Sequence, residues 1–205
     1  KNFPDTTTWL AGAYVQDEVE AGRLLVVPAV RLDYYSLRPR PDADFRRSAV
    51  VGEAQAVRSL DKVAVSPKLG VVYRLGPRFN VYAQYARGFR APPYDTANFG
   101  FTNRVLGYQI LPSFDLGPER SDGVEAGLRG RFADGSSFQL VGFYNRYTDF
   151  IATRVAGTAA GLTQFRYVNL SDVTIYGFEA RGEWRFAAEW AARASAAYAR
   201  GEDQD

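Results

Sequence analysis

Apolar and polar residues alternate with a period of two along most of the chain. In Phe178–Phe186 every even position is apolar or glycine and every odd position is charged. Val124–Phe132 follows the same alternation, with Gly127 as its one uncharged odd position. Successive side chains of a β-strand point to opposite faces. Each such segment is therefore predicted to be a strand with one apolar face and one charged face.

The alternation predicts eight strands, at about 9–19, 23–36, 63–75, 78–88, 121–132, 137–151, 166–186 and 190–200. Short turns are expected at 20–22, 76–77, 133–136 and 187–189. Longer loops are expected at about 37–62, 89–120 and 152–165. Tight turns at one end of a sheet and long loops at the other are typical of a transmembrane antiparallel β-barrel. The predicted fold class is therefore all-β.

The two faces of the predicted strands suit different environments. An arginine that faces the middle of a bilayer costs ~2–4 kcal/mol, so the charged face is predicted to line the barrel lumen. An eight-stranded barrel has little room inside, whereas a barrel of about 16–22 strands leaves a wide lumen. The eight strands are therefore predicted to be consecutive members of a larger barrel. Twelve side chains are assigned to the charged face: Arg31, Asp33, Lys68, Arg74, Glu125, Arg129, Arg131, Glu179, Arg181, Glu183, Arg185 and Arg193.

Aromatic residues collect near the predicted strand ends. Such rings gather at the membrane–water interfaces of barrels, although aromatic residues also favour strands in general. Combined with the loop asymmetry they favour a barrel over a soluble β-sandwich. The residues concerned are Tyr34, Tyr73, Tyr85, Phe89, Tyr144, Phe150, Trp184, Phe186, Trp190 and Tyr198.

Composition narrows the function classes. The 205 residues carry a net charge of +2 and include neither cysteine nor histidine. Nucleic-acid binding is not indicated, and thiolate or histidine metal sites and most hydrolytic triads are excluded. No apolar run approaches the ~18 residues that a membrane-spanning helix needs. Lys1–Asp5 has neither an initiator methionine nor a signal-peptide pattern, so we expect an internal piece of a longer polypeptide.

Two short motifs flank the longest predicted loop. The first is Phe89-Arg90-Ala91-Pro92, and the second is Ser113-Phe114-Asp115-Leu116, followed by Pro118-Glu119. In these motifs the chain resembles the TonB-dependent outer-membrane receptors, specifically their haem and haemoglobin receptor branch. That branch carries a Phe-Arg-Ala-Pro box and then an Asn-Pro-Asn-Leu box with a Pro-Glu pair after it. The first box is intact here, while the second retains Leu116 and a near match at Asp115.

The resemblance implies a 22-stranded barrel in the bacterial outer membrane, filled by a plug domain that lies outside this chain. All of residues 1–205 would then belong to the barrel domain. The implied partners are outer-membrane lipid, the TonB complex acting through the plug, and a haem, a host haem protein or a siderophore. The transported ligand would be haem or another ferric chelate, and no enzymatic activity is implied.

The resemblance also suggests ligand-binding candidates in and beside the loop 89–120. They are Phe89, Arg90, Ala91, Pro92, Tyr94, Tyr108, Asp115, Leu116 and Glu119. Haem receptors of the branch are thought to ligate iron through a histidine between the boxes, which this chain lacks. Tyrosinate is a remaining axial ligand, and Tyr94 and Tyr108 are the tyrosines between the boxes.

Two points stay open at the level of sequence. Arg90 can contact a ligand carboxylate, or it can form an internal salt bridge with Glu119 or Asp122. Tyr94 and Tyr108 can ligate haem with Arg90 and Arg104 as neighbouring cations, or they can simply pack within the loop. A ferric-siderophore receptor and a passive porin are the alternative functions.

Overall fold

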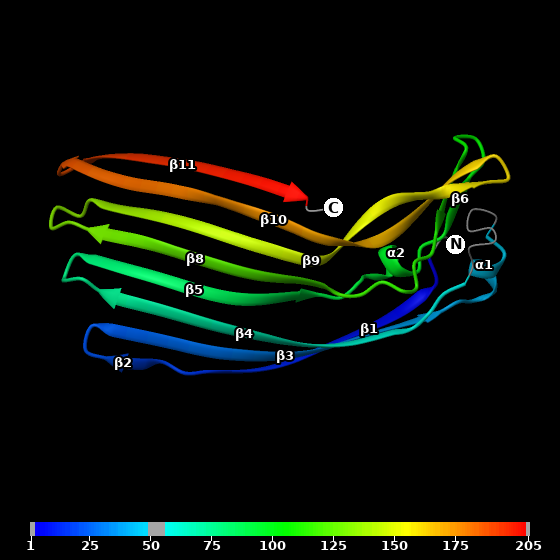
Figure 1. Cartoon of the computed structure of the whole chain (residues 1–205), viewed down its shortest axis with the longest axis horizontal. Helices are drawn as coiled ribbons and strands as arrows, with labels where there is room; N and C mark the ends of the chain where they lie inside the picture. Colours follow the sequence, from blue (N-terminus) through cyan, green and yellow to red (C-terminus); the bar gives the residue numbers. More distant parts are fainter. Residues whose placement is uncertain (1–2, 49–55, 204–205) are drawn as a thin grey trace.

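The strands form a single curved sheet with two short helices at one end (Figure 1). The computed structural model describes residues 3–48 and 56–203. The elements are β1 (Asp5–Gln16), β2 (Val19–Ala21), β3 (Leu24–Arg40), α1 (Ala43–Arg46), β4 (Leu60–Arg74), β5 (Phe79–Arg90), α2 (Tyr94–Ala97), β6 (Phe101–Asn103), β7 (Tyr108–Leu111), β8 (Glu119–Arg131), β9 (Ser137–Ala159), β10 (Leu162–Ala187) and β11 (Trp190–Asp203).

Long strands that follow one another in sequence also lie side by side. The sheet order is β1-β3-β4-β5-β8-β9-β10-β7-β6, with β11 paired to β10 and β2 paired to β3. Every pairing is antiparallel except that between β7 and β10. This meander of antiparallel strands confirms the predicted fold class.

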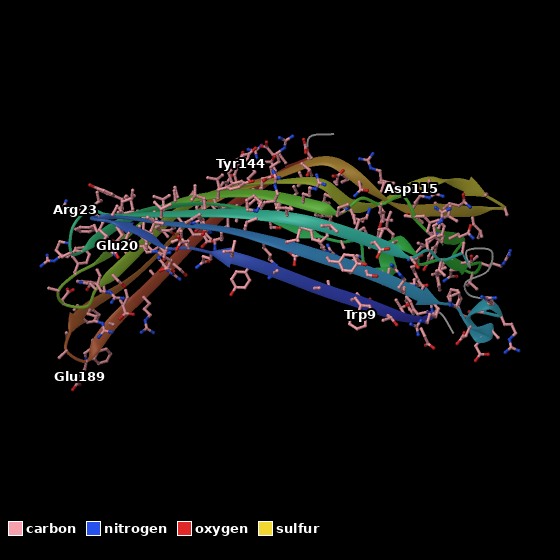
Figure 2. The ribbon with its side chains drawn as sticks, turned by 90° about the horizontal axis from the view of Figure 1, so that it is seen from below. Trp9, Glu20, Arg23, Asp115, Tyr144 and Glu189 are labelled. Carbon is pink, nitrogen blue, oxygen red and sulfur yellow. The ribbon has the colours of Figure 1, made fainter. Side chains whose placement is uncertain are left out.

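The connections differ at the two ends of the sheet. Tight turns gather at one end, which we call the turn end, and α1, α2 and β6 gather at the other, the loop end (Figure 1). Figure 2 shows the sheet curving between these ends, with Glu20, Arg23 and Glu189 at the turn end and Asp115 at the loop end. The loop asymmetry expected from the sequence is therefore present.

The eight predicted strands correspond to the eight long strands of the sheet. The first, expected at 9–19, is divided into β1 and β2. Both pieces pair with β3 in one continuous register, and the gap lies opposite Pro28. Proline has no N–H to give to the ladder. There Asp17 N still donates to Pro28 O at 3.0 Å.

The prediction of a long loop at 152–165 is wrong. β9 continues to Ala159 and β10 begins at Leu162, so this stretch is the tip of a long hairpin. Ala160 and Gly161 form the turn with φ of 50° and 77°, as the tight turn of a hairpin requires. Backbone pairing holds this stretch: β9 and β10 pair with each other, and β7 adds a parallel partner to β10 at Thr163–Arg166.

The loop predicted at 89–120 is only partly irregular. It contains α2 and the short hairpin of β6 and β7. The hairpin pairs with β10, so this loop joins the sheet rather than standing apart from it.

The strand register places all twelve predicted charged residues on one side of the sheet, because directly paired residues share a face. We call this the charged face and the opposite side the apolar face. Several side chains of the charged face form ion pairs with one another. Glu183 accepts from Arg185 at 2.9 Å and from Arg193 at 2.8 Å, and Arg31 lies 2.8 Å from Asp33.

Gly127 is the exception in its alternating segment because a ring occupies its space. A Cβ at this position would lie 2.6 Å from the ring of Tyr82 and 2.6 Å from Leu140 O. The guanidinium of Arg129 covers the same ring at 4.2 Å. The uncharged position thus accommodates an aromatic–cation pair on the charged face.

Three Tyr-X-Arg repeats cross the apolar face toward the loop end. They are Tyr85-Ala86-Arg87 in β5, Tyr144-Asn145-Arg146 in β9 and Tyr198-Ala199-Arg200 in β11. Each arginine forms an ion pair with a nearby acid, at 2.9 Å for Arg87–Asp122, 2.5 Å for Arg146–Asp172 and 2.9 Å for Arg200–Glu202. We call these side chains the Tyr–Arg belt.

Buried side chains gather at the loop end. Leu37 and Phe45 are each 1% exposed, whereas large apolar residues such as Trp9, Leu69 and Trp184 lie exposed along the sheet. Within the described residues, neither helix has the length or apolarity to cross a membrane. The strands thus present a broad apolar surface, and the chain packs its own side chains mainly where the loops meet.

Candidate functional site

The first box ends β5 and turns the chain into α2. Phe89 and Arg90 are the last residues of β5, and Pro92 is fully buried. Pro92 and Pro93 cannot donate to the ladder, so the strand stops and α2 begins at Tyr94. Phe89 has the register of the apolar face, whereas Arg90 has that of the charged face. The box therefore does not bring its four residues to one site.

Arg90 forms one of the two salt bridges considered from the sequence. Its Nη1 lies 3.0 Å from Oε2 of Glu119, its directly paired residue on β8. The side chain of Glu119 is only 9% exposed, and its other oxygen accepts from Ile151 N at 2.9 Å. Asp122 pairs with Arg87 instead. The side chain of Arg90 remains 65% exposed, so a ligand contact stays a prediction.

Tyr94 lies in an environment that opposes tyrosinate. Burial raises the pKa of Tyr94 to about 12, because the charged phenolate loses solvation there. Its ring packs edge-on against Phe3, with centroids 5.8 Å apart. Arg90, the cation expected to lower the pKa, is paired with Glu119. These observations favour the packing role of Tyr94.

Tyr108 belongs to a row of packed aromatic rings across the loop end. It lies 5.8 Å from Phe101 and 6.3 Å from Phe165 between ring centroids. The row continues to Tyr94 through rings 5.2–6.0 Å apart, and its members are Tyr94, Phe3, Phe99, Phe101, Tyr108 and Phe165. The two candidate tyrosines are thus joined through a packed aromatic row. Among the described residues, acidic, histidine and cysteine side chains form no cluster that could hold a metal.

The second box lines a cavity of about 640 Å³. Its wall is formed by residues 111–116 on one side and by β7 and the start of β10 on the other. Asp115 is exposed and Leu116 is buried. The described lining residues are Ala56, Gln109, Leu111, Pro112, Ser113, Phe114, Asp115, Leu116, Gln164, Arg166, Tyr167, Val168 and Asn169.

Hydrogen bonds from two asparagines, Asn169 in the cavity wall and Asn98 outside it, fix segments of the loop end. Asn169 accepts from Gly117 N at 2.8 Å and donates to Asp149 O at 2.6 Å. Asn98 is fully buried and grips the backbone of Arg58, accepting from its N–H at 2.6 Å and donating to its carbonyl at 3.0 Å. Asn169 ties the residue after the second box to β10, and Asn98 ties the end of α2 to the segment before β4, so the box is attached to a strand of the sheet.

Sequence reasoning missed the part of the cavity wall that β7 and β10 contribute. Gln109 and Gln164 fall in predicted loops, and Arg166 is only the first residue of the strand predicted at 166–186, so the alternation did not mark them as a site. The available signal was the resemblance to the receptor family, which extends to two further segments, Gly107-Tyr108-Gln109 and Asn169-Leu170-Ser171-Asp172-Val173. Of the predicted residues, only Asp115 and Leu116 line the cavity.

The curved antiparallel sheet and its two faces define the class of protein: the chain is part of a β-barrel wall that carries structured loops at one end. All of residues 1–205 match the family model described as "TonB dependent receptor-like, beta-barrel". The chain therefore belongs to this family, whose members are outer-membrane transport receptors. No curated protein matches the sequence.

Solved structures share the fold at low sequence identity. The haemophore receptor HasR of Serratia marcescens, solved with its haemophore HasA and haem, has a TM-score of 0.79 at 18% identity. The copper transporter OprC has a TM-score of 0.75 at 20% identity, and the siderophore receptor PirA from Pseudomonas aeruginosa one of 0.67 at 18%.

Each comparison covers 97% of this chain but only 35%, 30% and 43% of HasR, OprC and PirA. The chain thus spans less than half the length of these structures. Because these relatives transport different ligands, the likeness establishes the barrel fold and leaves the ligand to chemical argument.

Proposed function

We propose that this chain is part of the barrel of an outer-membrane receptor that binds haem, haemoglobin or another iron-containing ligand at its loop end. Uptake would be driven by a TonB complex through a plug domain. The supported cavity beside the second box, on a barrel of this family, is the observation that carries the proposal. The family match favours such a receptor over the passive porin considered from the sequence.

The membrane orientation follows from the two faces. The apolar face meets lipid because outward-facing arginines are costly in hydrocarbon. The Tyr–Arg belt suits the outer headgroup layer, where amphipathic rings and paired charges are solvated. The loop end beyond the belt is then extracellular, and the charged face lines the lumen.

Deleting most of the loop tests where the ligand binds. Ser113 N donates to Ala97 O at 3.0 Å, so residues 98–112 begin and end close together. Replacing them by a short glycine linker in the complete receptor should abolish ligand uptake while barrel insertion persists. Uptake and binding would be measured with haemin, haemoglobin and ferric siderophores. Unchanged uptake by the inserted deletion variant would place recognition elsewhere.

A further inference from the structure

Glu119 is a buried carboxylate at the place where β9 leaves the barrel wall. The residue is 7% exposed and begins β8. The pairing of β8 with β9 ends beside it, at Arg120 and Thr148. From residue 149 onward, β9 pairs only with β10 among the described residues, and the hairpin continues past α2 at the loop end (Figure 1). We call residues 149–170 the outer hairpin.

Both carboxylate oxygens of Glu119 are engaged. Oε2 accepts from Arg90 Nη1 at 3.0 Å, and Oε1 accepts from Ile151 N at 2.9 Å. Burying a charged carboxylate is costly unless it is paired and hydrogen-bonded, and both conditions are met here. The side chain is only 9% exposed, so it offers little surface to a ligand. Its contacts favour an action on the outer hairpin through Ile151.

A closed ring of contacts links the second box to both strands of the outer hairpin. Ile151 of β9 is paired directly with Asn169 of β10. Asn169 exchanges two hydrogen bonds with Gly117, accepting from its N–H at 2.8 Å and donating to its carbonyl at 3.2 Å. Gly117 is separated from Glu119 only by Pro118, which closes the ring. The outer hairpin is therefore fixed at its root to the segment that follows the second box.

The backbone bends at this root. Asp149 has a φ of 58°, a left-handed conformation that is uncommon outside glycine, and its carbonyl accepts from Asn169 Nδ2 at 2.6 Å. A residue keeps such a conformation only when the surrounding contacts hold it there. The hydrogen bonds that Asn169 and Glu119 make with Asp149 and Ile151 supply such contacts. The direction of the outer hairpin thus depends on these two side chains.

The outer hairpin carries one wall of the cavity beside the second box. β7 pairs with it at Thr163–Arg166, so β7 and the hairpin form one unit, to which Gln109 and Gln164 belong. The opposite wall, residues 112–116, leads directly toward Glu119. The hydrogen bond of Glu119 to the hairpin therefore joins the two walls. A change in the direction of the outer hairpin would change the width of the cavity between them.

We propose that Glu119 is a positioning residue, which sets the direction of the outer hairpin through its hydrogen bond to Ile151 N and thereby sets the width of the cavity. The salt bridge with Arg90 holds the carboxylate in place for this bond. A buried ion pair often adds little stability compared with apolar side chains of similar volume, so stability alone does not explain a glutamate here. This inference rests on the proposed function, because it makes ligand recognition depend on the position of the hairpin.

A distance across the bend tests the positioning directly. Spin labels at 144 and 158 of β9 in the complete receptor lie on either side of Asp149, and residues 1–205 contain no cysteine that would compete for the label. Pulsed electron paramagnetic resonance should give one narrow distance distribution. Glu119→Leu removes both contacts of the carboxylate and should broaden the distribution about twofold, because the root then opens more easily. Glu119→Gln keeps an oxygen that can accept from Ile151 N, so it should retain the narrow distribution.

Two further variants make this test decisive. Glu125→Leu makes the same change on the same face of β8 within the barrel wall, and it should leave the distribution unchanged. Ile151→Pro removes the hydrogen bond from the other side, because proline has no N–H, and it should broaden the distribution even if Glu119→Leu does not insert. An unchanged distribution in Ile151→Pro and in inserted Glu119→Leu would overturn the proposal. Equal broadening by Glu119→Gln and Glu119→Leu would also overturn it.

Ligand binding separates this inference from the proposed function. The probes are haemin, haemoglobin and ferrichrome, and the distance measurement requires none of them. A probe that binds the unaltered receptor should bind Glu119→Leu about tenfold more weakly and Glu119→Gln within about threefold, as loss or retention of one buried hydrogen bond implies. Unchanged affinity of inserted Glu119→Leu would overturn the role of Glu119 in recognition. Binding of none of the probes to the unaltered receptor would overturn the proposed function, while the distances would still decide the positioning.

Discussion

A single arginine placed on either face of β5 tests the membrane orientation. Ala83 lies on the apolar face, paired with Val71 and Ala126, whereas Gln84 lies on the charged face. Ala83→Arg puts a guanidinium against lipid if the proposed orientation is right. Gln84→Arg puts the same group one residue further along the strand, in the lumen.

The expected magnitude follows from the depth of Ala83 below the Tyr–Arg belt. Ala83 is four residues from Arg87, which is about 14 Å along a strand with a rise of ~3.4 Å per residue. With a strand tilt of about 40° this becomes a depth of about 10 Å, close to the middle of an apolar band ~25 Å tall. An arginine near the midplane costs ~2–4 kcal/mol, whereas the lumen substitution should change stability by only about 0.5 kcal/mol.

Reversible denaturation of the complete receptor in phospholipid vesicles, followed by tryptophan fluorescence, measures both free energies of unfolding. The expected result is a loss confined to Ala83→Arg, seen as a lower denaturant midpoint with an unchanged slope. Equal losses for the two variants, or a larger loss for Gln84→Arg, would refute the assignment of the apolar face to lipid.

Three further predictions concern the two faces, the loop end and Tyr94. Spin labels placed singly at 178 and 179 should report lipid and water respectively, because these positions lie on opposite faces; lipid contact at 179 would contradict the orientation. Asn98→Leu should increase proteolytic cleavage of the loops, because it leaves the Arg58 N–H and carbonyl without their partner at a cost of ~1–3 kcal/mol. An unchanged cleavage rate would show that the Asn98–Arg58 hydrogen bonds are dispensable. Burial raises the pKa of Tyr94 from 10.0 to about 12. The folded state therefore favours the protonated phenol, and this contribution to stability is complete below pH 10 and is lost as the pH rises toward 12. Tyr94→Phe should remove the late component of a tyrosinate absorbance titration, and an unchanged titration curve would contradict the raised pKa.

The alternation of side chains was enough to predict the fold class, the eight long strands and the twelve residues of the charged face. Period two is a local property of the strand backbone, so it survives in the sequence wherever one side of a strand is apolar. Three of the four tight turns were also marked locally, because they contain glycine or proline, whereas the turn at 187–189 contains neither and was predicted from the strands on its two sides.

The tip of the β9–β10 hairpin could not be read from this pattern. Most of its residues are small or polar, and β10 there is held by backbone pairing with β9 on one side and β7 on the other. Backbone pairing is independent of side-chain type, so it leaves no periodic trace. The same holds for the parallel pairing of β7 with β10, which creates one wall of the cavity.

Tertiary structure also decided between alternatives that the sequence left open. Arg90 could reach either Glu119 or Asp122, and the strand register places it opposite Glu119. The sequence likewise marked Asp115 and Leu116 through a family motif, but their joining with Gln109 and Gln164 depends on residues more than fifty positions apart. Local patterns determine which residues share a face, whereas a binding cavity depends on which distant segments meet, and only the folded chain specifies that.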